Sequence, residues 1–216
     1  MNYIDPKLSE YCEIYSSSEP EVLKEISRKT YLTQLNPRML SGHLQGRMLK
    51  LITQLLKPVN ILEIGTYTGY SAICMAEAIS EGSMIDTIEI NEELRDPILA
   101  NFETAGISKK VILHIGKALK IVPELLETKE YDMVFIDADK ENYPAYFNLL
   151  KDKMKKGSVI ITDNVLWSGK VINKIERETD LETIAIHKFN EMMAADLSFE
   201  KIILPIRDGI SIALKK

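Results

Sequence analysis

The chain has 216 residues, of which 45% are hydrophobic and 27% charged, so it can bury a core typical of a globular protein. Its formal net charge is −5 and its pI is about 5.4, and this acidity disfavours nucleic acid as a partner. Two cysteines exclude a disulfide scaffold. The lack of a long apolar stretch and of a leader-like N-terminus predicts a cytoplasmic protein with no membrane partner.

The first 57 residues are predicted to form a helical extension. Glu21–Thr33 has an amphipathic pattern that begins after Pro20, a residue common at helix starts. Ser41–Lys57 carries a second apolar stripe and is followed by Pro58, so we expect a second helix there.

Strand and helix signals alternate from residue 58 onward, and we expect this segment to be the core of a single domain that spans residues 1–216. Short apolar runs rich in β-branched residues predict strands at 59–64, 84–90, 110–115, 131–137 and 157–162. Helices are predicted at 70–80, 91–105, 117–127, 141–153 and near 180–196. This alternation predicts an α/β fold with a parallel sheet and helices on both faces.

Two further strand-like runs follow the last helix, Phe199–Ile206 and Ile210–Leu214. An Asp-Gly pair, Asp208 and Gly209, lies between them and is typical of a hairpin. The sheet is therefore predicted to be seven-stranded and mostly parallel, with an antiparallel C-terminal hairpin. Simple dinucleotide-binding folds continue with parallel strands, whereas a Rossmann-like methyltransferase fold has a reversed final strand.

A glycine turn follows the first predicted strand. Gly65 allows a sharp turn, and Gly69 allows close approach to the start of the next helix, where amide groups attract an anion. The Gly-x-x-x-Gly spacing lacks the glycine that cradles a diphosphate, which disfavours a dinucleotide. Glu63 before the turn suits an ammonium group. A ligand with both charges is an amino acid, such as the methionine part of S-adenosylmethionine.

Glu89 ends the next predicted strand, where an acidic side chain can accept hydrogen bonds from both hydroxyls of a ribose. Ala118 follows the third strand and could border an adenine. The alternative interpretation is that Glu63 and Glu89 are exposed carboxylates at strand ends.

Two later strands each end in polar residues that could bind a cation. Asp137 and Lys140 follow one strand, and Asp163 and Asn164 follow the next. If the strands are neighbours, two carboxylates and an amide oxygen converge at one edge of the sheet, and such a ligand set suits Mg²⁺, with Ca²⁺ or Mn²⁺ as alternatives. Lys140 is a candidate base for an acidic hydroxyl. Each aspartate could instead cap a helix.

Four stretches of the sequence occur together in a recognisable order and spacing: Leu62–Ser71, Phe135–Tyr143, Asp163–Val171 and Leu204–Gly209. With them the chain resembles the cation-dependent small-molecule O-methyltransferases, which include the catechol and caffeoyl-CoA O-methyltransferases. The caffeoyl-CoA branch is the more similar, and the resemblance covers roughly residues 35 to 215. Two positions depart from the usual pattern: Arg47 follows Gly46 where glutamine is frequent, and Ser168 stands where plant members carry asparagine.

The resemblance implies roles for individual residues. The residues implied to bind the cofactor S-adenosylmethionine are Ser41, Glu63, Gly65, Thr66, Gly69, Ser71, Glu89, Ala118 and Asp139. The implied ligands of the divalent cation are Asp137, Asp163 and Asn164, and the implied catalytic residues are Lys140, as general base, and Asp137. Trp167 and Ser168 are candidate substrate contacts, although Trp167 and Tyr143 could equally be packing residues.

The implied activity is divalent-metal-dependent transfer of a methyl group from S-adenosylmethionine to a hydroxyl of a small catechol-like or caffeoyl-type aromatic substrate, by a homodimer. Three alternatives are a non-catalytic S-adenosylmethionine-binding protein, an NAD-dependent oxidoreductase and a metal-independent methyltransferase of macromolecules.

Overall fold

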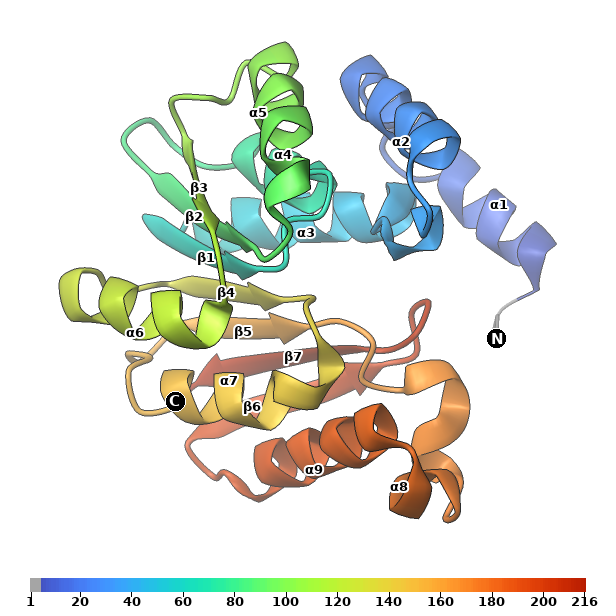
Figure 1. The fold of residues 1–216 in the computed structure, drawn as a ribbon, viewed down its shortest axis with the longest axis vertical. Coiled ribbons are helices and arrows are strands. Elements are labelled where there is room, and N and C mark those ends of the chain that lie inside the picture. The colour runs from blue at the N-terminus through green and yellow to red at the C-terminus, as the bar shows by residue number, and fades with distance from the viewer. Residues whose placement is uncertain (1–4) are drawn as a thin grey trace. The chain divides into compact units, whose positions relative to one another are not determined.

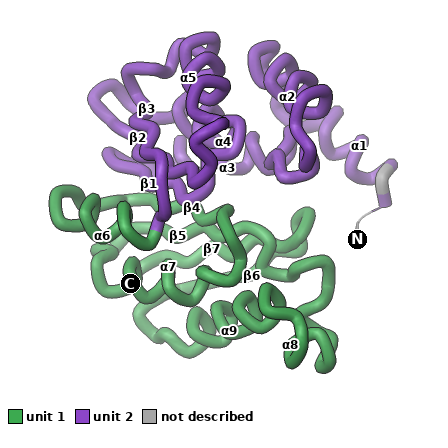
Figure 2. Tube along the Cα trace, viewed as in Figure 1, with its two compact units in different colours: residues 1–4, 119–216 green, residues 5–118 purple. Residues whose placement is uncertain are grey.

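Strands and helices alternate along most of the chain in the computed structural model, which describes residues 5–216 (Figure 1). The described residues group into an N-terminal unit, residues 5–118, and a C-terminal unit, residues 119–216, drawn in purple and green in Figure 2. This division falls inside the predicted core rather than at residue 58, so the single domain stays a prediction.

The N-terminal unit consists of helices and three parallel strands. Its helices are α1 (Pro6–Ile14), α2 (Glu21–Thr33), η1 (Pro37–Met39), α3 (Gly42–Leu56), α4 (Tyr70–Ala76), η2 (Glu92–Leu94) and α5 (Arg95–Thr104). Its strands are β1 (Asn60–Ile64), β2 (Met84–Glu89) and β3 (Val111–Ile115). β2 pairs in parallel with both β1 and β3, as predicted.

The C-terminal unit contains the remaining four strands. They are β4 (Met133–Ile136), β5 (Val159–Thr162), β6 (Phe199–Leu204) and β7 (Ile210–Lys215). The helices of this part of the chain are α6 (Ala118–Thr128), η3 (Lys140–Asn142), α7 (Tyr143–Leu150), η4 (Trp167–Ile172), α8 (Glu176–Thr179) and α9 (Leu181–Ala195). The sequence pattern predicts neither η4 nor α8, because helices this short cannot show an apolar period.

The strands follow the order β3-β2-β1-β4-β5-β7-β6 in one seven-stranded sheet. β4 and β5 run parallel, whereas β7 is antiparallel to both β5 and β6. The predicted Rossmann-like α/β fold with a reversed last strand is therefore confirmed, with helices around the sheet. Every residue of β4 and β5 is buried, which explains why both strands are uniformly apolar in the sequence.

Aromatic side chains join α7 to α9 and to β6 within the C-terminal unit, where the two helices lie side by side (Figure 1). The Phe189 ring of α9 makes edge contacts with Tyr143 and Phe147 of α7, at centroid distances of 5.7 and 5.9 Å. Phe147 also contacts the Phe199 ring of β6 at 5.9 Å. These contacts hold α7 against α9 and β6.

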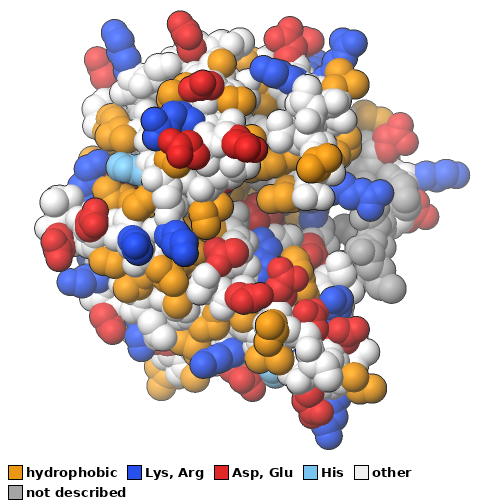
Figure 3. Space-filling view, viewed as in Figure 1, with side chains coloured by type: hydrophobic (Ala, Val, Ile, Leu, Met, Phe, Trp, Pro, Cys, Tyr) orange, Lys and Arg blue, Asp and Glu red, His pale blue; other side chains and the backbone are white. Residues whose placement is uncertain are grey.

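The surface carries charged side chains of both signs. On the face drawn in Figure 3, acidic and basic side chains are interspersed with apolar ones. Within residues 5–216, no helix combines the length and the apolar character that a bilayer crossing requires.

Gly69 marks a close approach between the glycine turn and α5. Its φ of 84° lies in the left-handed region, and a Cβ built there would lie 2.6 Å from a ring carbon of Phe102, which is itself buried. Asn101 of α5 also donates from Nδ2 to the Thr68 carbonyl at 2.9 Å. The turn is thus held directly against α5.

We expect Gly69→Ala to destabilise the protein by about 1–3 kcal/mol beyond the cost of backbone strain alone, because Phe102 cannot move aside without disturbing the core. Gly82→Ala is a matched control, since Gly82 has a φ of 83° but no atom within 4 Å of an added Cβ. Urea unfolding of both variants measures the difference. Equal losses of unfolding free energy would show that the contact with Phe102 has no energetic role.

Candidate active site

The end of β1 and the glycine turn form one buried polar cluster in the N-terminal unit. Glu63 is completely buried, and it accepts hydrogen bonds from Ser71 Oγ and Thr87 Oγ1, each at 2.5 Å. Thr87 Oγ1 also lies 2.6 Å from Thr66 Oγ1. Three predicted cofactor residues, Glu63, Thr66 and Ser71, therefore meet in the structure.

Glu89 joins the same turn from the end of β2. Its carboxylate accepts hydrogen bonds from the backbone N–H of Tyr67, at 2.7 Å, and from that of Asn91, at 2.8 Å. Glu63 and Glu89 are only 0% and 8% exposed, so the interpretation of both as exposed strand-end carboxylates is wrong.

The backbone explains the spacing of the two glycines. Gly65 has a φ of 102° and donates its N–H to the Ile88 carbonyl at 3.0 Å, so the chain turns while it is still bonded to β2. Gly69 donates to the Thr66 carbonyl at 2.9 Å and closes the turn before α4. Both glycines adopt positive φ, which a residue with a Cβ rarely adopts.

Ser41 and Ala118 are also buried within the N-terminal unit, at 5% and 8% exposure. Ser41 precedes the first residue of α3, and Ala118 begins α6. Their contact with a cofactor stays a prediction.

Thr87 belongs to the turn cluster, although the sequence alone did not predict it. It pairs in register with Glu63 across β1 and β2, so the two side chains emerge on the same face of the sheet. Only the register identifies this partnership, because a threonine inside an apolar strand carries no distinctive sequence signal.

An ion-pair cluster holds α3 against α4, the helix that follows the turn. Arg47 of α3 donates from both terminal nitrogens to the Glu77 carboxylate, at 3.0 and 3.1 Å, and Lys50 donates to the same group at 2.7 Å. Burial alone would raise the pKa of Glu77, but its hydrogen bonds with Arg47 and Lys50 lower that pKa below 4.5. Arg47 Nη2 also approaches Cys74 Sγ at 3.5 Å.

Cys74 is a packing residue. Its side chain is 0% exposed, and burial raises the pKa of its thiol to about 12. Gly46 allows the close approach of the two helices, because a Cβ there would lie 2.7 Å from Cys74 Sγ.

The predicted metal ligands lie together in the C-terminal unit, at the carboxyl ends of β4 and β5. Ile136 pairs in register with Thr162, and the Asp163 N–H donates to the Ile136 carbonyl at 3.0 Å. Asp137 and Asp163 thus leave neighbouring strands at the same point of the ladder, where strands are about 4.8 Å apart. Neither residue is the N-cap of a described helix, so the capping interpretation is wrong for both.

Lys140 lies beside the Asp137 carboxylate. Its Nζ is 2.9 Å from Asp137 Oδ1, and its side chain is only 11% exposed. Burial would lower the pKa of the ammonium group, but the Tyr143 hydroxyl and the Asp137 carboxylate more than offset this effect and raise the pKa above the usual lysine value.

Asn164 and the residues after it form an unusual backbone segment. Asn164, Trp167 and Ser168 have φ values of 60°, 45° and 53°, all in the left-handed region. The Trp167 ring lies 6.0 Å from Lys140 Nζ, and its indole Nε1 is buried with no hydrogen-bond partner among the described residues. Trp167 thus packs in part against its neighbours, and its indole N–H can still donate one hydrogen bond.

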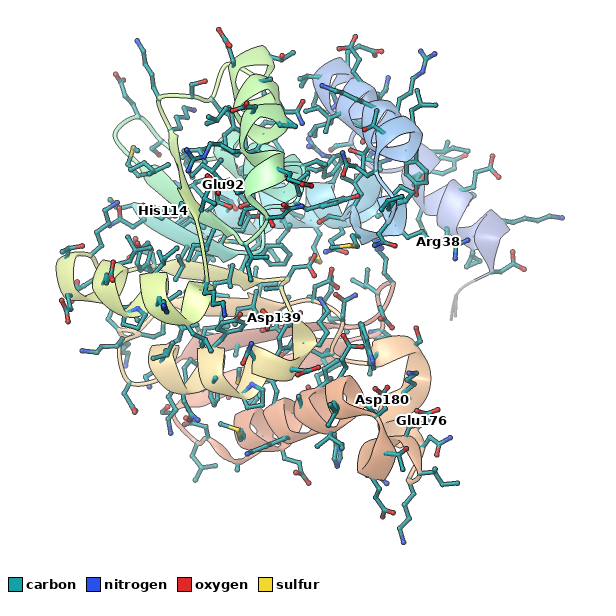
Figure 4. All side chains as sticks on the ribbon, viewed as in Figure 1. Arg38, Glu92, His114, Asp139, Glu176 and Asp180 are labelled. Carbon is teal, nitrogen blue, oxygen red and sulfur yellow. The ribbon has the colours of Figure 1, made fainter. Side chains whose placement is uncertain are left out.

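Tyr143 and Asp139 differ in their surroundings. Tyr143 is fully buried and donates its hydroxyl to the Asp163 carbonyl at 3.1 Å, so it packs beneath the site rather than at a substrate entrance. Asp139 is exposed in the loop between β4 and α7 (Figure 4), where it accepts hydrogen bonds from Tyr146 and Asn142.

The donor set fits a hard cation. Among residues 5–216, no group of three or more His, Cys, Asp or Glu side chains could hold a metal ion. The predicted set consists instead of two carboxylates and one amide, whose oxygen atoms suit Mg²⁺, Mn²⁺ or Ca²⁺ rather than a metal that prefers thiolate. Asp163 is 4% exposed, and a buried carboxylate beside a second one requires compensating positive charge.

Comparisons with known proteins identify the family. A profile of the O-methyltransferase family matches residues 13–216. A catechol O-methyltransferase from Niastella koreensis is 35% identical over 179 residues, with 80% of each chain covered. Caffeoyl-CoA O-methyltransferase 5 from Nicotiana tabacum is 34% identical over 202 residues, which are 90% of this chain and 84% of that protein.

Solved structures give the same result. An O-methyltransferase from Bacillus cereus, solved in complex with SAH, has a TM-score of 0.89 at 32% identity and covers 97% of both chains. TomG, an O-methyltransferase from Streptomyces achromogenes solved with SAM, has a TM-score of 0.87 at 29% identity, with 97% of this chain and 96% of that chain covered. The fold is that of a class I methyltransferase. The chain belongs to the O-methyltransferase family, whose members are S-adenosylmethionine-dependent enzymes.

We expect Glu77→Gln to lower the free energy of unfolding by about 1–3 kcal/mol at pH 7, because it weakens hydrogen bonds to two cations and leaves Arg47 buried without a counter-charge. Folding lowers the pKa of Glu77, so its stabilising effect is complete above its usual value of 4.5 and is lost as the pH falls through the lower folded-state value. Urea unfolding at pH 7 and near pH 4 tests this dependence.

Glu21→Gln is the control for that experiment, since Glu21 forms an ion pair with Lys24 on the surface and its side chain is 77% exposed. A difference between wild type and Glu77→Gln that does not shrink at the lower pH would contradict the assignment.

Proposed function

We propose that this enzyme transfers the methyl group of S-adenosylmethionine to a hydroxyl of a small catechol-like or caffeoyl-type aromatic substrate, with the help of a divalent cation. The single observation that carries this proposal is the ladder hydrogen bond from the Asp163 N–H to the Ile136 carbonyl, which continues the parallel pairing to the point where both aspartates leave the sheet. The names of the catechol and caffeoyl-CoA relatives support the substrate class.

Asp137, Asp163 and Asn164 are the proposed ligands of the cation. When bound, a divalent cation lowers the pKa of a neighbouring hydroxyl and so makes it a better nucleophile. Two hydrogen bonds hold Asp163 in place for this role: its Oδ1 accepts the Asn164 N–H at 2.7 Å, and its backbone carbonyl accepts the Tyr143 hydroxyl at 3.1 Å. Mg²⁺ is the first candidate, because this set contains only oxygen donors.

The glycine turn is the proposed cofactor site. S-adenosylmethionine supplies a methyl group on a positively charged sulfur. In our proposal Glu63 pairs with its ammonium group and Glu89 accepts hydrogen bonds from its ribose hydroxyls. The proposed contacts around them are Ser41, Gly65, Thr66, Gly69, Ser71, Ala118 and Asp139. The short hydrogen bonds of Glu63 with Ser71 and Thr87 support its part, because they hold the carboxylate in one orientation.

Lys140 is the proposed general base, and Asp137 is the second proposed catalytic residue. We expect the positioning of the reactants by the cation ligands to contribute more to the rate than proton transfer to Lys140. Orienting two reactants accounts for about 7–11 kcal/mol of barrier reduction in favourable cases. Proton transfer by a side chain typically contributes 10²–10⁴-fold in rate, which corresponds to about 3–5 kcal/mol. The unpaired Nε1 of Trp167 supports a substrate contact for Trp167 and the adjacent Ser168. The homodimer is proposed from family resemblance.

Methyl transfer should depend on a divalent cation. We expect the purified protein to methylate a catechol or a caffeoyl ester with labelled S-adenosylmethionine, to stop after treatment with EDTA, and to recover when Mg²⁺ is added. Scintillation counting of the extracted product measures the transfer. Turnover that EDTA leaves unchanged would contradict the role of the cation. Absence of activity on every vicinal diol tested would contradict the substrate class.

Asp163→Ala should reduce turnover at least as much as Lys140→Met, because the first variant removes a positioning ligand whereas the second removes one proton acceptor. Lys155→Met is the matched control, since Lys155 is half exposed and pairs only with surface carboxylates among its described contacts. Steady-state kinetics under saturating Mg²⁺ decide the order. An Asp163→Ala enzyme that keeps most of its activity would rule out our assignment.

A further inference from the structure

The loop between β6 and β7 forms hydrogen bonds with residues 164–168, the segment that begins with Asn164. The Asp208 carboxylate accepts hydrogen bonds from the Ser168 N–H at 2.5 Å and from Asn164 Nδ2 at 3.5 Å. The backbone adds two more, because the Leu166 N–H donates to the Asp208 carbonyl at 2.9 Å and the Val165 N–H donates to the Gly209 carbonyl at 3.1 Å. Four hydrogen bonds thus fix a segment of five residues.

This segment requires outside support. Asn164, Trp167 and Ser168 each adopt a positive φ, a conformation that costs free energy for residues with a Cβ and persists only where neighbours impose it. The partner at both ends of the segment is one carboxylate, that of Asp208. Asp208 therefore links the conformation of the segment to that of the hairpin.

Gly209 allows the hairpin to come this close. A Cβ on Gly209 would lie 2.4 Å from Leu166 Cγ and 2.9 Å from the Leu166 backbone nitrogen. A larger residue would push the loop away from the segment and break the backbone hydrogen bonds. The Asp-Gly pair thus acts in two ways. The Asp208 carboxylate accepts hydrogen bonds from the segment, and the lack of a side chain on Gly209 allows the loop to approach it closely.

We infer that Asp208 is a positioning residue for the cation site, an inference that rests on the proposed function. A carboxylate can only accept hydrogen bonds, so it selects the amide nitrogen of Asn164 and leaves the amide oxygen for the cation. An asparagine whose amide is not fixed in this way would present its nitrogen, which cannot bind a cation, for part of the time. Asp208 also adds a negative charge behind the ligands.

Manganese binding tests this inference without relying on turnover. We expect Asp208→Asn to weaken the binding of Mn²⁺ by about 10-fold, the lower end of the range for outer-shell partners of metal ligands. Electron paramagnetic resonance of free Mn²⁺, titrated with protein, gives the dissociation constant for each variant. A dissociation constant equal to that of the wild type would overturn the inference.

Asp196→Asn is the matched control. Asp196 also accepts a backbone N–H and a side-chain hydroxyl, both from Ser198, at 2.9 and 2.6 Å, but it lies at the other end of β6 and contacts no proposed ligand. Circular dichroism and urea unfolding report whether each variant is folded. We expect Asp196→Asn to lose stability while its Mn²⁺ affinity stays that of the wild type; a parallel loss of affinity would show a general effect of stability and overturn the inference.

A second pair of variants covers the case in which Asp208→Asn is poorly folded. Asn164→Asp places two carboxylates face to face, and adding Asp208→Asn restores an amide–carboxylate pair with its polarity reversed. We therefore expect Asn164→Asp to change the Mn²⁺ dissociation constant by a smaller factor in the Asp208→Asn background than in the wild type. Equal factors in both backgrounds would overturn the inference.

Asp163→Ala distinguishes a failure of the proposed cation site from a failure of the proposed role of Asp208. If the wild type binds Mn²⁺, and Asp163→Ala abolishes binding while Asp208→Asn leaves it intact, the proposed cation site stands and the role of Asp208 falls. If the wild type shows no Mn²⁺ binding that depends on Asp163, both the cation site and the role of Asp208 fall.

Discussion

The parallel pairing of β4 with β5 is the constraint on which the proposed chemistry depends. Two carboxylates at the ends of neighbouring strands repel each other, and one of them, Asp163, is almost fully buried. Eight buried ladder residues in the two strands oppose that repulsion by fixing the backbone. Lys140 supplies positive charge at one side. At the proposed site, a bound cation would relieve the repulsion between the two carboxylates.

The N-terminal unit meets a different requirement, the support of the glycine turn. The glycine turn needs positive φ at Gly65 and Gly69, so its conformation cannot come from side chains of its own. Support comes from its neighbours instead. Glu89 accepts the Tyr67 N–H, and the Arg47–Glu77 ion pair joins α3 to the end of α4. The turn and the proposed metal ligands therefore rest on separate sets of contacts, one in each unit.

Much of this arrangement can be predicted from the sequence, and the reasons are physical. β2 was expected at 84–90 and is Met84–Glu89, because buried parallel strands are apolar and short. The convergence of Asp137 and Asp163 follows from the shared carboxyl edge of parallel strands.

The partners that were missed all depend on tertiary register. Thr87 meets Glu63 through strand pairing, and Asp208 reaches Asn164 through a hairpin that lies far away in the sequence. The positive φ values of Trp167 and Ser168 could not be foreseen either, since nothing about these residue types favours that conformation.

The contrast between the two cysteines has a practical consequence. Cys12 is exposed on α1, whereas Cys74 is sealed between α3 and α4 with a thiol pKa of about 12. The nucleophile in alkylation is the thiolate, so at neutral pH a maleimide dye reacts with the first and spares the second. The natural chain thus accepts a single fluorophore on its N-terminal helix without any engineering, and peptide mass spectrometry can verify the attachment point.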